Sequence, residues 1–212
     1  MNQFGGGGLV NIKPDTYLPR TDGPDFRFKT SSLLANENDN PVAIDRATRA
    51  LVGITYSHHE IHAGSHYLAK SYFSLAKNAT FEFLIVTPNS SKWAHMTASI
   101  GNSAGIITAT LYKDATYSAI GTEWTTWNRN HNFPNDNTTK IYLTPTITST
   151  GTVVDSGSLG AGKKLGGGAA RDEEEKVLAE NTIYLVRIIE QNIANTIISW
   201  GFDWYEHTSK TD

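Results

Sequence analysis

The last apolar stretch of the chain, residues 195–207, alternates large hydrophobic side chains with small or polar ones. If the stretch is extended, one of its sides carries Ile198, Trp200, Phe202 and Trp204. A period of two with aromatic rings on one face is typical of a strand that packs on a sandwich core. The pattern therefore predicts a closing β-strand in which Trp200 and Trp204 are buried.

Similar alternation recurs upstream, in segments rich in the aromatic and β-branched residues that favour strands. The expected strands are residues 67–75, 80–87, 93–100, 106–113, 141–148, 182–190 and 196–206, with one or two more, or a short helix, within 42–56. Short connections at 76–79 and 191–195 predict two hairpins. About eight strands at this spacing predict an all-β fold, a jelly-roll-like antiparallel β-sandwich.

The first 41 residues differ from the rest because Gly5–Gly8 and several prolines interrupt any regular element. They also carry apolar residues that a solvated linker would lack. We expect an extended arm that lies on another surface, although a frayed terminus is the alternative. The expected contact residues of this arm are Phe4, Leu9, Val10, Ile12, Tyr17, Phe26 and Phe28. The remainder, residues 42–212, is expected to form a sandwich domain with long insertion loops at 116–139 and 151–181.

Composition narrows the classes of function. Eighteen basic and 21 acidic residues give a net charge of −3, without the basic cluster that nucleic-acid binding requires. The chain has no cysteine, which excludes disulfides and thiolate metal sites. It also has no apolar run of about 18 residues, the length of a membrane-spanning helix. We therefore expect neither nucleic acid nor membrane among the partners.

The segment from Ser57 to His66 contains four histidines and a glutamate. On a strand, His58, Glu60 and His62 would share a face and could bind a metal ion. The spacing differs from the zinc-protease pattern, which has two residues between the glutamate and the second histidine. The favoured alternative is a polar patch whose imidazoles bond to backbone or to a neighbouring subunit.

Three further motifs suggest chemistry only weakly. Gly157–Lys164 resembles a phosphate-binding loop, but it ends in lysine where serine or threonine belongs, and no helix is expected after it. Arg171–Lys176 is acidic, yet its spacing is not that of a calcium loop, so a solvated turn is expected. Trp124 and Trp127 could form a subunit interface, cap the sandwich or stack on a sugar. No nucleophile motif or paired-carboxylate arrangement is present, so we expect no enzymatic activity and no cofactor.

Two segments together resemble an uncharacterised group of tailed-bacteriophage virion proteins: LVGITYSHHEIHAGSHY at residues 51–67 and DWYEH at residues 203–207. The glycine-rich loop and residues 180–187 fit the same pattern. Members resemble head decoration, or cement, proteins, so the resemblance implies a structural role. It further implies binding to the major capsid protein through the arm, a homotrimer at a local threefold axis, and a place on the capsid exterior after assembly in the host cytoplasm.

In such a trimer we expect inter-subunit contacts from His58, His59, Glu60, His62, His66, Trp124 and Trp127. Other functions stay open at this point. The chain could be a tail, neck or baseplate component, or a carbohydrate-binding module that uses Trp124 and Trp127. An enzyme that uses the histidine segment ranks last.

Overall fold

The computed structural model describes residues 56–160, 164–165, 175–191 and 195–208. Nearly all of this part of the chain is β-structure, preceded by one short helix. In chain order the elements are α1 (Tyr56–His62), β1 (His66–Leu75), β2 (Thr80–Val86), β3 (Lys92–Asn102), β4 (Ile106–Lys113), β5 (Thr116–Ala119), β6 (Thr122–Glu123), β7 (Trp127–Asn128), β8 (Lys140–Leu143), β9 (Thr146–Ser149), β10 (Thr152–Gly160), β11 (Lys164–Leu165), β12 (Lys176–Val177), β13 (Ile183–Glu190) and β14 (Thr196–Thr208).

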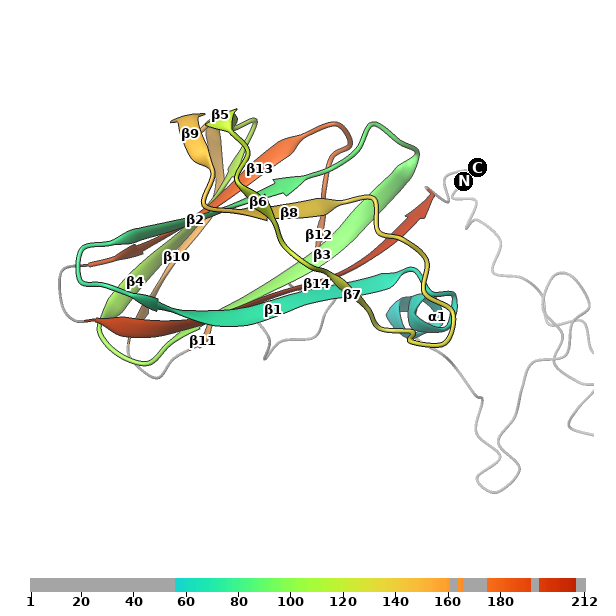
Figure 1. Cartoon of the computed structure of the whole chain (residues 1–212), viewed down its shortest axis with the longest axis horizontal. Coiled ribbons are helices and arrows are strands. Elements are labelled where there is room, and N and C mark those ends of the chain that lie inside the picture. The colour runs from blue at the N-terminus through green and yellow to red at the C-terminus, as the bar shows by residue number, and fades with distance from the viewer. Residues whose placement is uncertain (1–55, 161–163, 166–174, 192–194, 209–212) are drawn as a thin grey trace, which may run out of the picture. The chain divides into compact units, whose positions relative to one another are not determined.

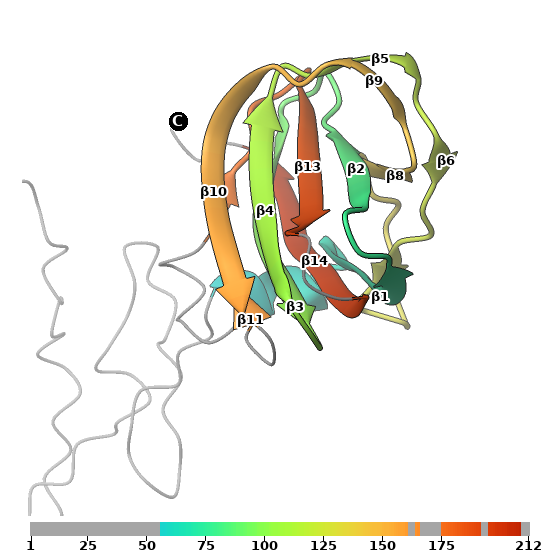
Figure 2. The ribbon, with the colours of Figure 1, turned by 90° about the vertical axis from the view of Figure 1, so that its left-hand side faces the viewer.

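The strands form two antiparallel sheets that face each other (Figures 1 and 2). The first sheet has the order β11-β3-β14-β1-β7, with β12 also paired to β3. The second sheet has the order β10-β4-β13-β2-β8-β6, and β5 and β9 form a separate two-stranded sheet. Figure 1 shows α1 beside the start of β1, at one end of the first sheet.

The long strands pair in the nested way that defines a jelly roll. β1 pairs with β14, β2 pairs with β13, and β4 pairs with β10. The strands β1 to β4 alternate between the two sheets, and the later strands pair back onto them, as in the eight-stranded double Greek key. The predicted fold class, a jelly-roll-like antiparallel sandwich, is confirmed.

The prediction of two hairpins is wrong. Residues 76–79 join β1 to β2, and residues 191–195 join β13 to β14, but each pair of strands is divided between the sheets. The physical reason is that both strands carry an apolar inner face, so each supplies one wall of the core. Across that core, the ring of Phe73 in β1 stacks on that of Phe81 in β2 with centroids 3.9 Å apart.

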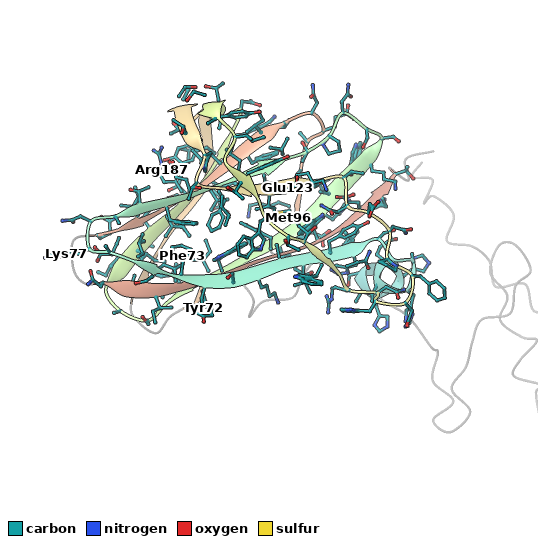
Figure 3. The ribbon with its side chains drawn as sticks, in the orientation of Figure 1. Tyr72, Phe73, Lys77, Met96, Glu123 and Arg187 are labelled. Carbon is teal, nitrogen blue, oxygen red and sulfur yellow. The ribbon has the colours of Figure 1, made fainter. Side chains whose placement is uncertain are left out.

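The core between the sheets confirms the prediction for the closing strand. Only 5% of the surface of Trp200 and 0% of that of Trp204 is exposed to solvent. Burying an apolar side chain as large as the adjacent Phe202 contributes about 1.5–3 kcal/mol. Figure 3 shows Phe73 pointing between the sheets, whereas its neighbour Tyr72 points away and is 75% exposed.

The two insertions are only partly loops. Residues 116–139 contain β5, β6 and β7, of which β6 and β7 extend the edges of the second and first sheets. Residues 151–181 begin with β10, so the expectation of a loop is wrong there. This strand was not recognised because it lies at an exposed edge and a bulge between Val153 and Asp155 interrupts its period.

The single strand expected at 141–148 is divided into β8 and β9. Thr144 adopts a positive φ of 53°, and Pro145, which follows, cannot donate a backbone hydrogen bond. After this turn, β9 pairs with β5, and residues of this two-stranded sheet pack with Leu84 and Leu185 on the outer face of the second sheet.

The arm and most of segment 42–56 lie outside the described residues, so the predicted roles of Phe4, Leu9, Val10, Ile12, Tyr17, Phe26 and Phe28 stay predictions. In the described part of the chain, no helix is long and apolar enough to cross a membrane.

Candidate functional site at the corner of α1, β1 and β14

The two segments that carry the resemblance meet at one end of the first sheet. In the pairing of β1 with β14, His66 lies opposite Tyr205 and Tyr67 lies opposite Trp204. The backbone N–H of Glu206 donates to the carbonyl of Ser65 at 3.0 Å. Segments from the two ends of the described chain therefore form one corner, with α1 beside it.

The corner depends on a glycine that ends α1. Gly64 has a φ of 71°, the left-handed conformation that commonly follows the last residue of a helix. A Cβ atom at this position would lie 2.1 Å from the carbonyl oxygen of Phe133. Only glycine therefore lets the helix end and the 116–139 insertion approach this closely.

Asparagines of the 116–139 insertion cap the end of α1. The last carbonyl groups of a helix have no partners within it. Three side-chain amides donate to successive carbonyls at 3.0, 3.0 and 2.7 Å, in the pairs Asn130–His62, Asn135–Ala63 and Asn128–Gly64. The asparagines near the tryptophans thus hold the corner together.

His66 is fully buried and lies between two oxygen acceptors. Its Nε2 atom is 2.7 Å from Oδ1 of Asp203, and its Nδ1 atom is 3.1 Å from the carbonyl oxygen of Ser57. Both ring nitrogens of this side chain therefore lie within hydrogen-bond distance of an acceptor oxygen. The other carboxylate oxygen of Asp203 accepts from Nη1 of Arg129 at 3.2 Å. This chain of polar contacts joins α1, β1, β14 and the insertion.

Glu206 is also buried at this corner, at 3% exposure. Its carboxylate accepts hydrogen bonds from the backbone N–H of Thr138 at 2.9 Å and of Thr139 at 2.8 Å. It also accepts from the Thr138 hydroxyl at 2.7 Å and from Nε1 of Trp204 at 3.1 Å. A carboxylate held by this many donors fixes the chain entering β8 to the end of β14.

Tyr67 lies among these carboxylates and acts as a hydrogen-bond donor. Burial raises the pKa of its hydroxyl above the ordinary value of 10.0, and the charges of Glu206, Asp136 and Glu60 raise that pKa further. The hydroxyl donates to the carbonyl oxygen of Asp136 at 3.2 Å. It therefore stays protonated at neutral pH, when it cannot serve as a base.

The metal-binding trio considered for His58, Glu60 and His62 rested on a strand, and that premise is wrong because the segment is helical. Glu60 is buried, whereas His58 and His62 are exposed one turn apart with their Nε2 atoms 3.0 Å apart. Among the described residues there is no cluster of three or more His, Cys, Asp or Glu side chains with the geometry of a metal site.

The expected inter-subunit residues divide by exposure. His58, His59, His62 and Trp127 are exposed. Glu60 and His66 are buried within this chain, which leaves them almost no surface to offer a neighbour.

The two tryptophans of the insertion have different environments. Trp124 packs edge to face against Trp200, with ring centroids 5.7 Å apart, so it belongs to the core. Trp127 is 60% exposed. The two rings therefore do not form one stacking platform.

A second polar cluster lies on the outer face of the first sheet, beside the corner. The carboxylate of Glu175 accepts from the hydroxyl of Tyr205 at 2.8 Å and lies 2.7 Å from Nδ1 of His95. His207 lies beside His95 with ring centroids 4.5 Å apart. Sequence reasoning did not place Glu175 beside His95, because only the pairing of β12 with β3 brings these two residues together.

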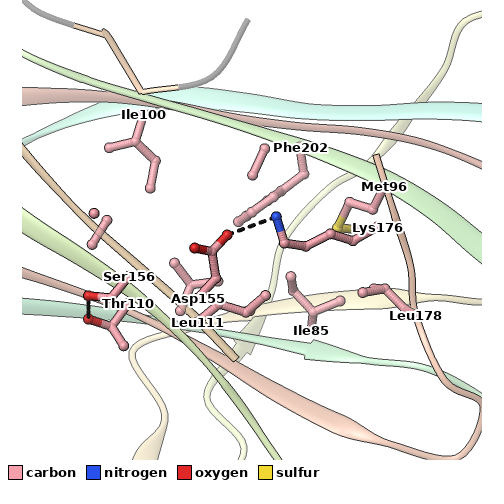
Figure 4. A pocket seen from close by; sticks show the side chains of 14 residues that line it. Ile85, Met96, Ile100, Thr110, Leu111, Asp155, Ser156, Lys176, Leu178 and Phe202 are labelled. Carbon is pink, nitrogen blue, oxygen red and sulfur yellow. Dashed lines mark hydrogen bonds and ion pairs between the residues drawn. The ribbon is translucent and has the colours of Figure 1, made fainter. Parts of the chain in front are cut away.

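A cavity of about 290 Å³ opens between the sheets at the edge formed by β10 and β12 (Figure 4). It exists because the inner positions there are small: Gly157 lies opposite Ala109 in the strand pairing, and Ala98 lines the same space. The wall is mainly apolar, and an ion pair of 2.8 Å joins Asp155 to Lys176 beside it. Because Gly157 belongs to a strand, the start of the glycine-rich motif lacks the conformation of a phosphate-binding loop.

Comparison with known proteins adds no relative: no protein-family model, curated protein or solved structure matches this chain. Function must therefore be inferred from the corner, the cavity and the surface.

Proposed function

We propose that this chain is a non-enzymatic structural protein of a tailed-phage virion. In its specific form, the proposal is a capsid decoration protein that binds the major capsid protein through residues 1–41 and assembles as a trimer. The resemblance carried by residues 51–67 and 203–207 supports the class of protein, and the contacts of those residues support the absence of an enzymatic role.

The observation that carries the proposal is how the polar residues of the corner are used. Asp203 and Glu206 hold other parts of the same chain, and the Tyr67 hydroxyl donates to a backbone carbonyl. Catalytic groups usually converge on a cavity that admits a substrate. The cavity at the edge formed by β10 and β12 lies elsewhere, and its lining includes none of the corner residues. The polar residues within segments 51–67 and 203–207 thus serve to hold this corner of the fold together.

The open edge of the sandwich supports assembly with other chains. Val153 and Val154 of β10 and Val177 of β12 are each more than half exposed. A sheet edge with exposed apolar side chains favours pairing with another chain unless it is covered. Jelly rolls are common in viral capsid proteins, although a fold by itself does not determine a function.

The proposal is tested by adding the purified full chain to capsids that lack it and measuring bound protein by co-sedimentation. We expect saturable binding for the full chain and at least a tenfold loss when residues 1–41 are deleted, with an unchanged folded domain by circular dichroism. A full-length variant, Phe26→Ser with Phe28→Ser, should also bind less, whereas Tyr72→Ser on the outer face of β1 is the matched control. Equal attachment without the arm would refute the clamp, and failure of the full chain to bind heads would refute decoration.

A tail, neck or baseplate role would give binding to those assemblies and not to heads. A carbohydrate-binding role would require Trp127→Ala to lose retention on a glycan column with its fold intact. Only one exposed ring is available for that contact, because Trp124 packs on Trp200.

A further inference from the structure

The cavity between β10 and β12 departs from the side-chain pattern that fills the rest of the core. In a β-sandwich, side chains from the inner faces of both sheets interdigitate to form the core. On β10, the inward positions that follow the pattern of the buried Leu159 are Gly157 and Asp155, opposite Ala109 and Leu111. A glycine at one inward position and a carboxylate at the next leave this part of the core unfilled.

A second charged residue occupies an inward position on the edge of the facing sheet. Lys176 lies opposite the buried Met96 in the pairing of β12 with β3, so the two side chains share a face. Its Nζ atom is 2.8 Å from Oδ2 of Asp155, and this ion pair links the edges of the two sheets (Figure 4). The side chains of Asp155 and Lys176 are 53% and 47% exposed, so the pair lies at the mouth of the cavity.

The interior of the cavity is apolar and shielded from solvent. Ile85, Val186 and Phe202 line it, and each of them is at most 6% exposed. The hydroxyls of Thr110 and Ser156, which also border the cavity, lie 2.9 Å from each other. A cavity with apolar walls does not hold water well, and its lining lacks van der Waals partners while it is empty. The cavity therefore favours an apolar occupant.

The volume of the cavity limits the size of that occupant. It is about 290 Å³, whereas an engineered apolar cavity of about 150 Å³ binds benzene. A bicyclic aromatic molecule or a short hydrocarbon chain therefore fits. A strand of another chain inserted between the sheets would have to displace the ion pair, whereas a small molecule can occupy the space behind it.

We propose that this cavity binds a neutral, mainly apolar small molecule of about the size of indole. The ion pair has no net charge, so a charged group at the mouth is attracted by one partner and repelled by the other. A neutral N–H or O–H group avoids this conflict and can donate a hydrogen bond to the carboxylate of Asp155. The bound molecule would thus direct its one polar group toward the mouth and its rings toward Phe202.

The test uses the full-length protein with indole as the probe, titrated by calorimetry and followed by methyl NMR. We expect saturable binding of one molecule per chain, with a dissociation constant below about 1 mM, and shifts of the Ile85 and Val186 methyl signals. Ala98→Leu places a larger side chain in the cavity and should weaken binding at least about tenfold. Ala119→Leu is the matched control, because Ala119 is also an exposed alanine of a strand but does not line the cavity.

Charged relatives of the probe test the position of the ion pair. An indole carboxylate should bind the wild-type protein more weakly than indole does. It should gain about two- to fivefold in Asp155→Asn, which removes the negative charge beside Lys176. An aminomethyl-indole cation should gain by a similar factor in Lys176→Met. A purely structural ion pair would change the affinities for the two ions by the same factor.

Circular dichroism checks that each variant is folded, and Ala98→Val, with an expected loss of about threefold in affinity, replaces Ala98→Leu if the latter does not fold. Absence of saturable indole binding to the wild-type protein would overturn the proposal, since the cavity is then closed or filled by protein. Binding that both Ala→Leu variants leave unchanged, or weaken equally, would locate the probe elsewhere and overturn it as well. The inference does not rest on the proposed virion role.

Discussion

Glu206 provides the sharpest test of how the corner is held. In the Glu206→Ala variant, the backbone N–H of Thr139 and Nε1 of Trp204 lose their acceptor, and both donors are buried. A buried donor without a partner costs about 1–3 kcal/mol. The donors of Thr138 are only half-buried, so water can replace much of their loss. We therefore expect the free energy of unfolding to fall by about 2–6 kcal/mol.

The assay is urea unfolding of the full chain followed by tryptophan fluorescence, at one fixed protein concentration because assembly would shift the midpoint. The matched control is Glu123→Gln, which breaks an exposed ion pair of 3.2 Å with Lys140. That control should change the free energy of unfolding by less than about 1 kcal/mol. If Glu206→Ala is no less stable than the control, the carboxylate does not hold the corner and the account of this site is wrong.

Three further predictions follow from the fold. Folding raises the pKa of Tyr67, so as the pH rises the unfolded chain loses the hydroxyl proton before the folded chain does, and the free energy of unfolding should fall above about pH 10. In urea titrations at alkaline pH, Tyr67→Phe should reduce that fall, whereas Tyr72→Phe should not. Ala98→Val should partly fill the cavity, which should increase the free energy of unfolding by about 0.5–2 kcal/mol and raise the melting temperature. A lower melting temperature would mean that the cavity cannot accept a larger side chain. Asn128→Ala removes a cap of α1 and should speed amide exchange in α1 while that of β13 stays unchanged, and equal exchange in both variant and wild type would contradict the capping role.

The strand pattern predicted much of this fold because side-chain alternation is a local property. The rings of β14 point inward as their spacing indicates, and Trp200 and Trp204 are buried. What the local pattern does not contain is the partner of each strand. The pattern of segments 67–75 and 80–87 is typical of a hairpin, yet the two strands belong to opposite sheets. Their apolar faces pack against each other across the core, and their backbones do not pair.

Sequence reasoning singled out the histidine segment and the closing strand, but it did not predict that they lie side by side. Of the histidine segment, only the last residue pairs with the closing strand: His66 lies opposite Tyr205. The helical conformation of YSHHEIH could not be predicted, because the segment lacks an apolar period and its end is fixed by asparagines far along the chain. The link from His95 to Glu175 depends on strand pairing in the same way.

The most direct test of the central claim is electron cryo-microscopy of intact virions that contain this protein. The proposed role predicts jelly-roll density of this topology on the outside of the head, repeated at local threefold positions over the whole shell. Density confined to the tail, neck or baseplate, or absence of the protein from the particle, would contradict it.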